Sequence, residues 1–228
     1  MNWKNYLGTS IGKKLIVGAT GLFLISFLVV HCYVNAMIFW CDNGKHFTEA
    51  AGFMGGNVAV RILEVGLFLG LIAHIVQGLM LWSQNSKRRT TRYEVSAGNK
   101  TSRWYSRSMG LLGTLILLFL VMHLYHFWAP NRYGQAFDAA WKEEDLYDKM
   151  LAVFSETWVV VIYLLGCFSL AWHLMHGFFS GFQTFGLATH KYKGLIRSIG
   201  IAFSILIPLI FAAMPVYLHM VACSAPHQ

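Results

Sequence analysis

Five long apolar runs decide what this chain can fold into. They lie roughly at 15–39, 62–82, 109–129, 158–182 and 199–222. Each reaches the ~20 residues that a helix needs to cross ~30 Å of hydrocarbon. Because 56% of the residues are hydrophobic and only 12% are charged, the sequence predicts an all-α polytopic membrane protein, with 1–228 as a single domain of five transmembrane helices. The first run is too long for a signal-peptide core and lacks a cleavage site after it, so we expect it to be retained.

The positive charges indicate how this bundle lies in the membrane. Most of the Lys and Arg residues fall in the segments 1–14, 83–107 and 183–198, whereas most acidic residues fall in the alternating segments 40–61 and 130–157. By the positive-inside rule the N-terminus is cytoplasmic, and five spans then place the C-terminus outside. The net charge of +8 therefore reports topology, and no nucleic-acid partner is expected.

The four cysteines indicate no zinc or dithiol site. Cys32, Cys41, Cys167 and Cys223 show no C-x-x-C spacing, so zinc-ribbon, thioredoxin-like and covalently attached haem sites find no support. Cys41 and Cys223 both fall near the outer face, where they could pair.

Histidines recur in four successive apolar runs. The intramembrane histidines are His31, His74, His123, His126, His173 and His176, and the fifth run has only His219, near its outer end. A single histidine in a membrane helix usually hydrogen-bonds to a neighbouring helix. Histidines on four helices in succession favour a shared cofactor instead.

The depths of four of these histidines divide them into two pairs. Counted from the nearest charged residues, His31 and His123 lie in the outer half of helices that run outward. His74 and His173 lie further inward, on helices that run inward. Each pair joins two helices at similar depth, which is the arrangement that two axial ligands of a flat metal macrocycle require.

Glycines follow both inner histidines at the same spacing. The patterns "HIVQG" and "HLMHG" place Gly78 and Gly177 one helical turn beyond His74 and His173, on the same helix face. A porphyrin could lie against the backbone there. Glycine in membrane helices also serves helix–helix contact, and this alternative stays open.

Bis-histidine ligation of b-type haem fits this pattern best. Imidazole binds zinc, copper and iron alike, but the carboxylates and thiolates of most zinc or copper sites are missing here. We therefore predict two haems b, each held by one pair of histidines. His126 and His176 are expected not to ligate, because His123 better matches the depth of His31 and because His173 has the glycine.

The arrangement resembles the five-helix, di-haem cytochrome b subunit of succinate:quinone oxidoreductases, the family of succinate dehydrogenases and quinol:fumarate reductases. The resemblance covers nearly the whole chain and is carried by "TGLFLISFLVVH", "RILEVGLFLGLIAHIVQG", "VMHLY" and "WHLMHGFFSGFQTFG". In that family the first and third haem-bearing helices bind the outer haem, and the second and fourth bind the haem nearer the cytoplasm. This division matches the pairs that depth predicts.

The resemblance implies partners that spacing alone does not show. A flavoprotein subunit and an iron–sulfur subunit would dock on the cytoplasmic face of a bacterial inner membrane, and this chain would hold no dicarboxylate active site. Electrons from succinate would pass through the inner and outer haems to a quinone, menaquinone in preference to ubiquinone, in the respiratory chain and the tricarboxylic acid cycle. The basic loop 83–107 would face the iron–sulfur subunit, or would serve only topology and contact with anionic lipid.

One departure and two alternatives accompany this hypothesis. Some quinol:fumarate reductases carry a glutamate two residues before the inner ligand of the fourth helix, where this chain has Ala171. A proton route through that position is therefore not expected, which favours a succinate dehydrogenase. The alternatives are the cytochrome b subunit of a hydrogenase, formate dehydrogenase or nitrate reductase, and a haem-free transporter or anchor.

A single acidic residue lies within the five apolar runs. Glu64 stands three residues after Arg61, near the outer end of the second run. An i, i+3 ion pair with Arg61 would explain it without a function. In the functional interpretation, Glu64 exchanges the proton that accompanies quinone chemistry beside the outer haem. His46 and Glu49 in the first outer loop are weaker candidates for that task.

Overall fold

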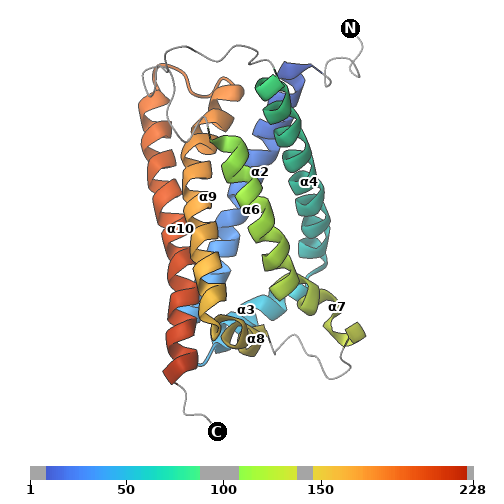
Figure 1. The fold of residues 1–228 in the computed structure, drawn as a ribbon, viewed down its shortest axis with the longest axis vertical. Coiled ribbons are helices and arrows are strands. Elements are labelled where there is room, and N and C mark those ends of the chain that lie inside the picture. Colours follow the sequence, from blue (N-terminus) through green and yellow to red (C-terminus); the bar gives the residue numbers. More distant parts are fainter. Residues whose placement is uncertain (1–8, 88–107, 138–145, 225–228) are drawn as a thin grey trace.

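Five long helices form the body of the molecule. A computed structural model describes the chain except for residues 1–8, 88–107, 138–145 and 225–228 (Figure 1). The long helices are α2 (Ser10–Ala36), α4 (Val58–Lys87), α6 (Met109–His123), α9 (Thr157–Thr184) and α10 (Lys193–Ser224). Each is part of a stretch long and apolar enough to cross a membrane. The predicted all-α fold is thus confirmed, with five long apolar helices that could cross a membrane, and successive long helices run in opposite directions (Figure 1).

Helices α2 and α4 start earlier than the predicted apolar runs, and a polar residue caps each of them. The Thr9 hydroxyl accepts a hydrogen bond from the Gly12 amide at 3.1 Å, and the Asn57 side-chain oxygen accepts one from Ala59 at 2.9 Å. Such caps satisfy amide groups that have no partner within the helix. The residues of this first helical turn are partly polar, so a prediction from hydropathy alone leaves them out of the helix.

The third span continues past the predicted end at residue 129. A five-residue π-helix, η3 (Leu124–Trp128), follows α6 and leads directly into α7 (Ala129–Phe137). Pro130 cannot donate a backbone hydrogen bond, and its ring would crowd the carbonyl four residues earlier in a regular α-helix. The wider π turn, in which the Ala129 amide bonds to the Leu124 carbonyl, accommodates the proline without ending the helix.

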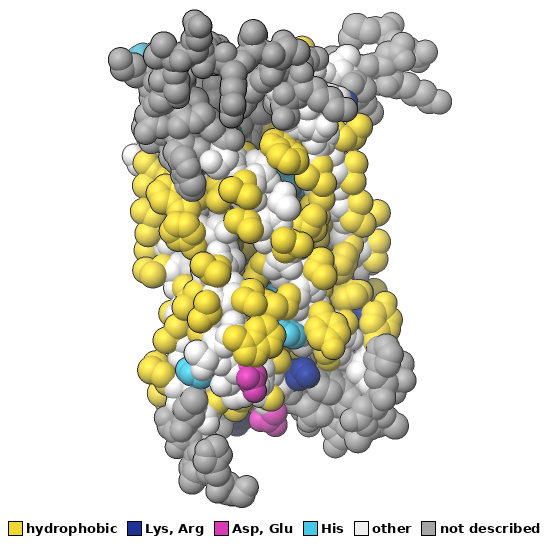
Figure 2. Space-filling view, in the orientation of Figure 1, with side chains coloured by type: hydrophobic (Ala, Val, Ile, Leu, Met, Phe, Trp, Pro, Cys, Tyr) yellow, Lys and Arg dark blue, Asp and Glu magenta, His cyan; other side chains and the backbone are white. Residues whose placement is uncertain are grey.

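The spans differ in how deeply they are buried. Helix α9 packs against α10, α2 and α6, whereas α4 packs mainly against α2. In their most apolar windows 39% of the α9 residues are buried but none of those of α4. Figure 2 shows hydrophobic side chains over the middle of the visible face and acidic groups only toward one end. This is the surface that a membrane-embedded bundle requires.

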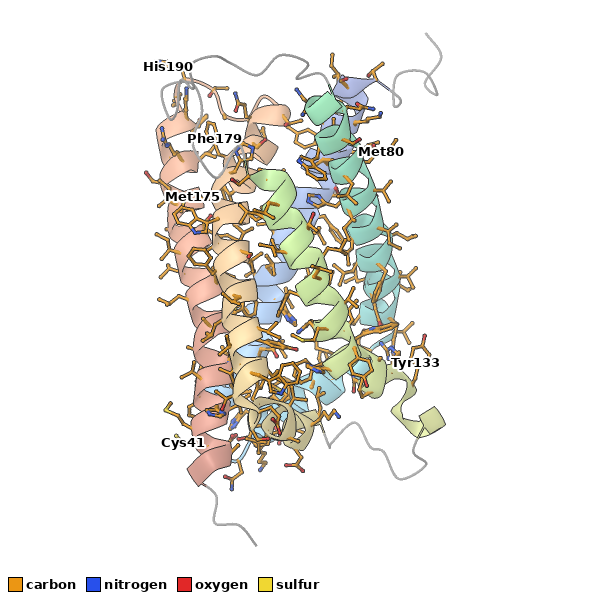
Figure 3. All side chains as sticks on the ribbon, in the orientation of Figure 1. Cys41, Met80, Tyr133, Met175, Phe179 and His190 are labelled. Carbon is orange, nitrogen blue, oxygen red and sulfur yellow. The ribbon has the colours of Figure 1, made fainter. Side chains whose placement is uncertain are left out.

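Short helices close the end of the bundle where α2 stops and α9 begins. They are η1 (Met37–Phe39), α3 (Lys45–Gly56) and α8 (Leu146–Phe154) (Figure 1). Buried side chains from these elements join α9 and α10 in one hydrophobic cluster that includes Ile38, Phe47, Phe154, Tyr163 and Leu218. Cys41 and Tyr133 lie at this end of the molecule and His190 at the other (Figure 3). Cys41 is exposed, while the side chain of its suggested disulfide partner Cys223 lies outside the described residues.

Asp42 holds the start of α3. Its carboxylate accepts hydrogen bonds from the amides of Gly44 (3.1 Å) and His46 (2.9 Å) and pairs with the His46 imidazole. The side-chain and backbone hydrogen bonds from His46 hold the pKa of Asp42 below its ordinary value. The imidazole of His46, a weaker candidate for proton transfer, is thus engaged in a local contact with Asp42.

The start of α3 should therefore loosen in acid. A carboxylate whose pKa is depressed by folding stabilises the fold above its unfolded pKa, and this stabilisation is lost as the pH falls through the folded value. Trp40 reports the change, because its ring centroid lies 4.4 Å from that of His46. The Trp40 signal is the difference between the fluorescence of the unchanged protein and that of Trp40→Phe. We expect this signal to change as the pH falls, and the change to be absent in Asp42→Asn. An unchanged transition in Asp42→Asn would contradict the assignment.

Candidate functional site

The outer histidine pair lies in an aromatic surround. The ring centroids of His31 on α2 and His123 on α6 are 5.8 Å apart, with an interplanar angle of 89°. Phe27 stacks on His31 at 5.2 Å, and Phe119 stacks on His123 at 5.7 Å. Phe211 of α10 lies 5.5 Å from His31. The fifth long helix thus contributes a side chain to this site, whereas the sequence predicted a site formed by the first four helices alone.

The inner pair has a different surround. The centroids of His74 on α4 and His173 on α9 are 6.2 Å apart. A Cβ added to Gly21 would lie 3.3 Å from the His74 ring, and one added to Gly113 would lie 3.8 Å from the His173 ring. The Thr20 hydroxyl lies 3.1 Å from His74 Nδ1. The inner imidazoles therefore lie against small or polar residues of α2 and α6, whereas the outer imidazoles lie against aromatic rings.

Both pairs have dimensions that fit a metal held between two imidazoles. Bonds between imidazole nitrogen and a metal are about 2 Å long, so two such bonds plus the two ring radii give a centroid separation of about 6 Å. In the described part of the chain, no group of three or more His, Cys, Asp or Glu side chains could hold a metal ion. A pair supplies only two ligands, so a metal held there would need further ligands from outside the described side chains, which a macrocycle could supply.

Unpartnered polar atoms mark the same places. Within the described residues three buried side-chain atoms lack a hydrogen-bond partner, namely Nδ1 of His123, Nδ1 of His173 and Oε1 of Gln77. Buried polar groups are nearly always paired, so such exceptions point to a missing group. One lies in each histidine pair, and Gln77 is three residues from His74 on the same helix face. Each histidine pair therefore contains one buried ring nitrogen that the described residues leave unsatisfied.

Neighbouring histidines are engaged elsewhere. His126 Nδ1 lies 3.2 Å from the Tyr163 hydroxyl, and the two rings stack with an interplanar angle of 8°. His219 Nδ1 lies 2.7 Å from the Phe154 carbonyl oxygen. His126 thus has the kind of interhelical contact expected of a single membrane histidine, which supports the choice of His123 as the candidate ligand.

Gly78 and Gly177 contact no neighbouring helix in the described structure. A Cβ added to either would meet nothing within 4 Å in the described structure outside its own helix backbone. The alternative that these glycines serve helix–helix contact is therefore not supported. Their role beside a cofactor stays a prediction.

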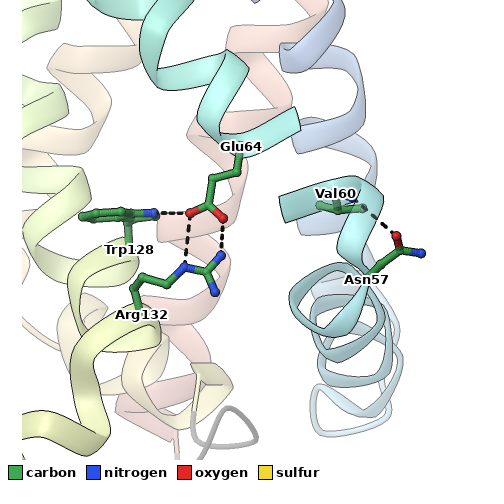
Figure 4. A network of polar contacts seen from close by, with 5 residues as sticks. All are labelled: Asn57, Val60, Glu64, Trp128 and Arg132. Carbon is green, nitrogen blue, oxygen red and sulfur yellow. Dashed lines mark hydrogen bonds and ion pairs between the residues drawn. The ribbon is translucent and has the colours of Figure 1, made fainter. Parts of the chain in front are cut away.

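Glu64 forms a network across two spans. Its Oε1 accepts hydrogen bonds from Trp128 Nε1 at 2.7 Å and from Arg132 Nε at 3.2 Å, and Oε2 pairs with the second guanidinium nitrogen (Figure 4). Both charged side chains are about four-fifths buried, at 20% and 21% exposure. Glu64 thus forms an ion pair, as the structural interpretation of the sequence predicted. The partner that the structure shows is Arg132 on α7, whereas the sequence suggested Arg61.

Sequence reasoning missed the partners of the candidate residues. Trp128 and Arg132 are four residues apart, so they lie on one face and reach Glu64 together. A signal for Arg132 was present, because a carboxylate inside a membrane span requires a cationic partner. No comparable signal marks Thr20, since threonines occur elsewhere in the spans.

Gly166 on α9 is predicted to be necessary for the outer pair. A Cβ there would lie 2.6 Å from the ring of Phe119, which stacks on His123. Gly166→Ala should cost about 1–3 kcal/mol relative to Gly66→Ala, since overpacking strains a filled space. Gly66 is the matched control, because a Cβ there meets nothing within 4 Å. Thermal unfolding in detergent would check this, and equal melting temperatures would contradict it.

Taken together, the fold and its histidines define an all-α protein with five helices able to span a membrane and two histidine pairs between them. Comparisons with protein-family models, with curated proteins and with solved structures found no match for this chain.

Proposed function

We propose that this chain is the membrane-anchor cytochrome b subunit of a succinate:quinone oxidoreductase. The observation that carries the proposal is the pair of facing histidines at each of two depths, contributed by four different spans. When bound there, two b-type haems would supply one-electron transfer across the bilayer between an iron–sulfur subunit and a quinone.

The residues of this chain hold and orient the proposed group. His31 and His123 would be the axial ligands at one depth, and His74 and His173 those at the other. The aromatic rings of the outer site exclude water from the imidazoles and fix their planes. Gly78 and Gly177, where an added Cβ would meet nothing within 4 Å in the described structure, would be the positions against which the inner haem packs.

Orientation follows from charge. The end at which α2 begins and α4 stops would face the bacterial cytoplasm and dock the iron–sulfur and flavoprotein subunits. The basic loop proposed to face them, with Lys87 to Arg107, lies outside the described side chains. The end with α3 and α8 would face outward and include the C-terminus.

Glu64 would serve the quinone, taken to be menaquinone, at the outer end. Three donor contacts occupy both acceptor positions of Oε1 and one of Oε2. A carboxylate has about four such positions, so the contacts shown leave a position on Oε2 at which a quinol oxygen would deliver its proton. Arg132 and Trp128 would hold the carboxylate in place while this proton moves.

Two other classes of protein share some of these features. The cytochrome b subunit of a hydrogenase, formate dehydrogenase or nitrate reductase also uses membrane histidines but serves a different soluble partner. A haem-free transporter would use the histidines as a proton relay. Among the described residues Nδ1 of His123 and Nδ1 of His173 have no partner, which counts against a relay, since a relay requires hydrogen-bonded neighbours.

Two measurements test the proposal. The purified chain should show reduced b-type absorption bands from two haems, and their absence would end the haem hypothesis. Affinity purification from the native membrane should recover a flavoprotein subunit and an iron–sulfur subunit. Recovery of a hydrogenase or molybdenum subunit in their place would identify the nearer alternative.

A further inference from the structure

Thr20 is the one threonine whose hydroxyl the described structure places on a histidine of either pair. Its Oγ1 lies 3.1 Å from His74 Nδ1 and 2.7 Å from the Ile16 carbonyl oxygen. A hydroxyl has a single proton, and the short contact to the carbonyl requires it, because a carbonyl can only accept. The Thr20 oxygen therefore presents a lone pair to His74, and His74 Nδ1 must carry the proton that completes the bond.

This contact, with the Val17 carbonyl as a second acceptor for the ring, favours the tautomer of His74 that is protonated at Nδ1. An imidazole protonated at Nδ1 has its free lone pair on Nε2, which is the atom left to bind a metal. Gly21, next to Thr20, leaves just enough space, since a Cβ there would lie 3.3 Å from the Cε1 atom of the ring. Consecutive residues of α2 thus set both the protonation and the position of the ring on α4.

The other three histidines of the two pairs lack such an acceptor. His31 Nδ1 lies 3.3 Å from the amide nitrogen of Asn35, which is a donor. Nδ1 of His123 and Nδ1 of His173 have no partner among the described residues. The four imidazoles are therefore inequivalent, and His74 alone is held by a hydroxyl on a neighbouring span.

We infer that Thr20 is a positioning residue that tunes the inner haem through His74, an inference that rests on the proposed function. A hydrogen bond donated by the far nitrogen of a ligating imidazole raises its basicity and fixes its plane. A more basic ligand stabilises ferric over ferrous iron. Thr20 accordingly lowers the midpoint potential of the inner haem relative to the same site without the hydroxyl.

The test is a redox titration of the haem absorption bands in the purified complex. Thr20→Val should shift one of the two titration waves to higher potential, or release that haem, while the other wave stays in place. A tenfold change in the preference for ferric over ferrous iron corresponds to a shift of about 59 mV. Thr20→Ser restores the hydroxyl and should titrate like the unchanged protein.

Thr114 provides the matched control. Its hydroxyl donates to the Gly110 carbonyl at 2.9 Å, the same type of bond within its own helix, with no contact to a histidine ring in the described structure. Thr114→Val should leave both waves unchanged. Two unmoved waves in Thr20→Val, or a shift in Thr20→Ser or in Thr114→Val as large as that in Thr20→Val, would overturn the inference. Absence of haem from the unchanged protein would instead overturn the proposed function, and the inference with it.

Discussion

Replacing Glu64 by Gln is expected to lower quinone-coupled turnover by about 100-fold or more, the usual contribution of a positioned acid or base. Glutamine keeps the size and polarity of the side chain but cannot take up a proton at Oε2. Under the proposed function, succinate oxidation by an artificial acceptor should persist, because it would not use this end of the chain. Both haems should also persist, and steady-state assays with each acceptor, together with an absorption spectrum, measure these effects.

A second substitution separates proton transfer from charge balance. Glu64→Gln leaves the Arg132 guanidinium, 20% exposed, without its counter-charge, and removing one member of a buried pair is itself destabilising. The double variant Glu64→Gln with Arg132→Gln removes both charges. It should recover the yield and thermal stability of the complex but not its quinone turnover. Recovery of turnover in the double variant would assign Glu64 to structure alone.

Removing one histidine is expected to remove one haem of two. His31→Gly or His123→Gly should abolish the outer haem and leave the inner one, and His74→Gly or His173→Gly should do the converse. The reason is that the members of each pair face one another across 5.8 and 6.2 Å, whereas the two pairs draw on different spans. Haem content per chain and the residual spectrum measure the loss.

Added imidazole and a neighbouring histidine provide the controls. Imidazole should restore the missing haem in a glycine variant, because it fills the space of the deleted ring and supplies the same ligand atom. His126→Ala should keep both haems, since its contact is with Tyr163 at 3.2 Å. Loss of the outer haem in His126→Ala but not in His123→Gly would exchange the two assignments.

The sequence by itself determined the five spans and the relative depths of the histidines. Both can be obtained by counting residues along the chain. The length of an apolar run sets the length of a helix in hydrocarbon, and the number of residues from the nearest charged boundary sets the depth of a side chain in the membrane. For this reason His31 and His123, and likewise His74 and His173, could be paired by counting residues. The carboxylate of Glu64 could also be marked, because an acidic residue within an apolar run requires a partner.

The tertiary structure alone decided which side chains meet across the spans. Rotation of each helix about its axis is set by packing, as where Gly166 admits the ring of Phe119, and no count along the chain reveals it. Thus Arg132 reaches Glu64 from 68 residues away because the third span continues through a π turn past Pro130. The Thr20 hydroxyl meets His74 across 54 residues for the same reason, since α2 packs on α4 with these two faces in register.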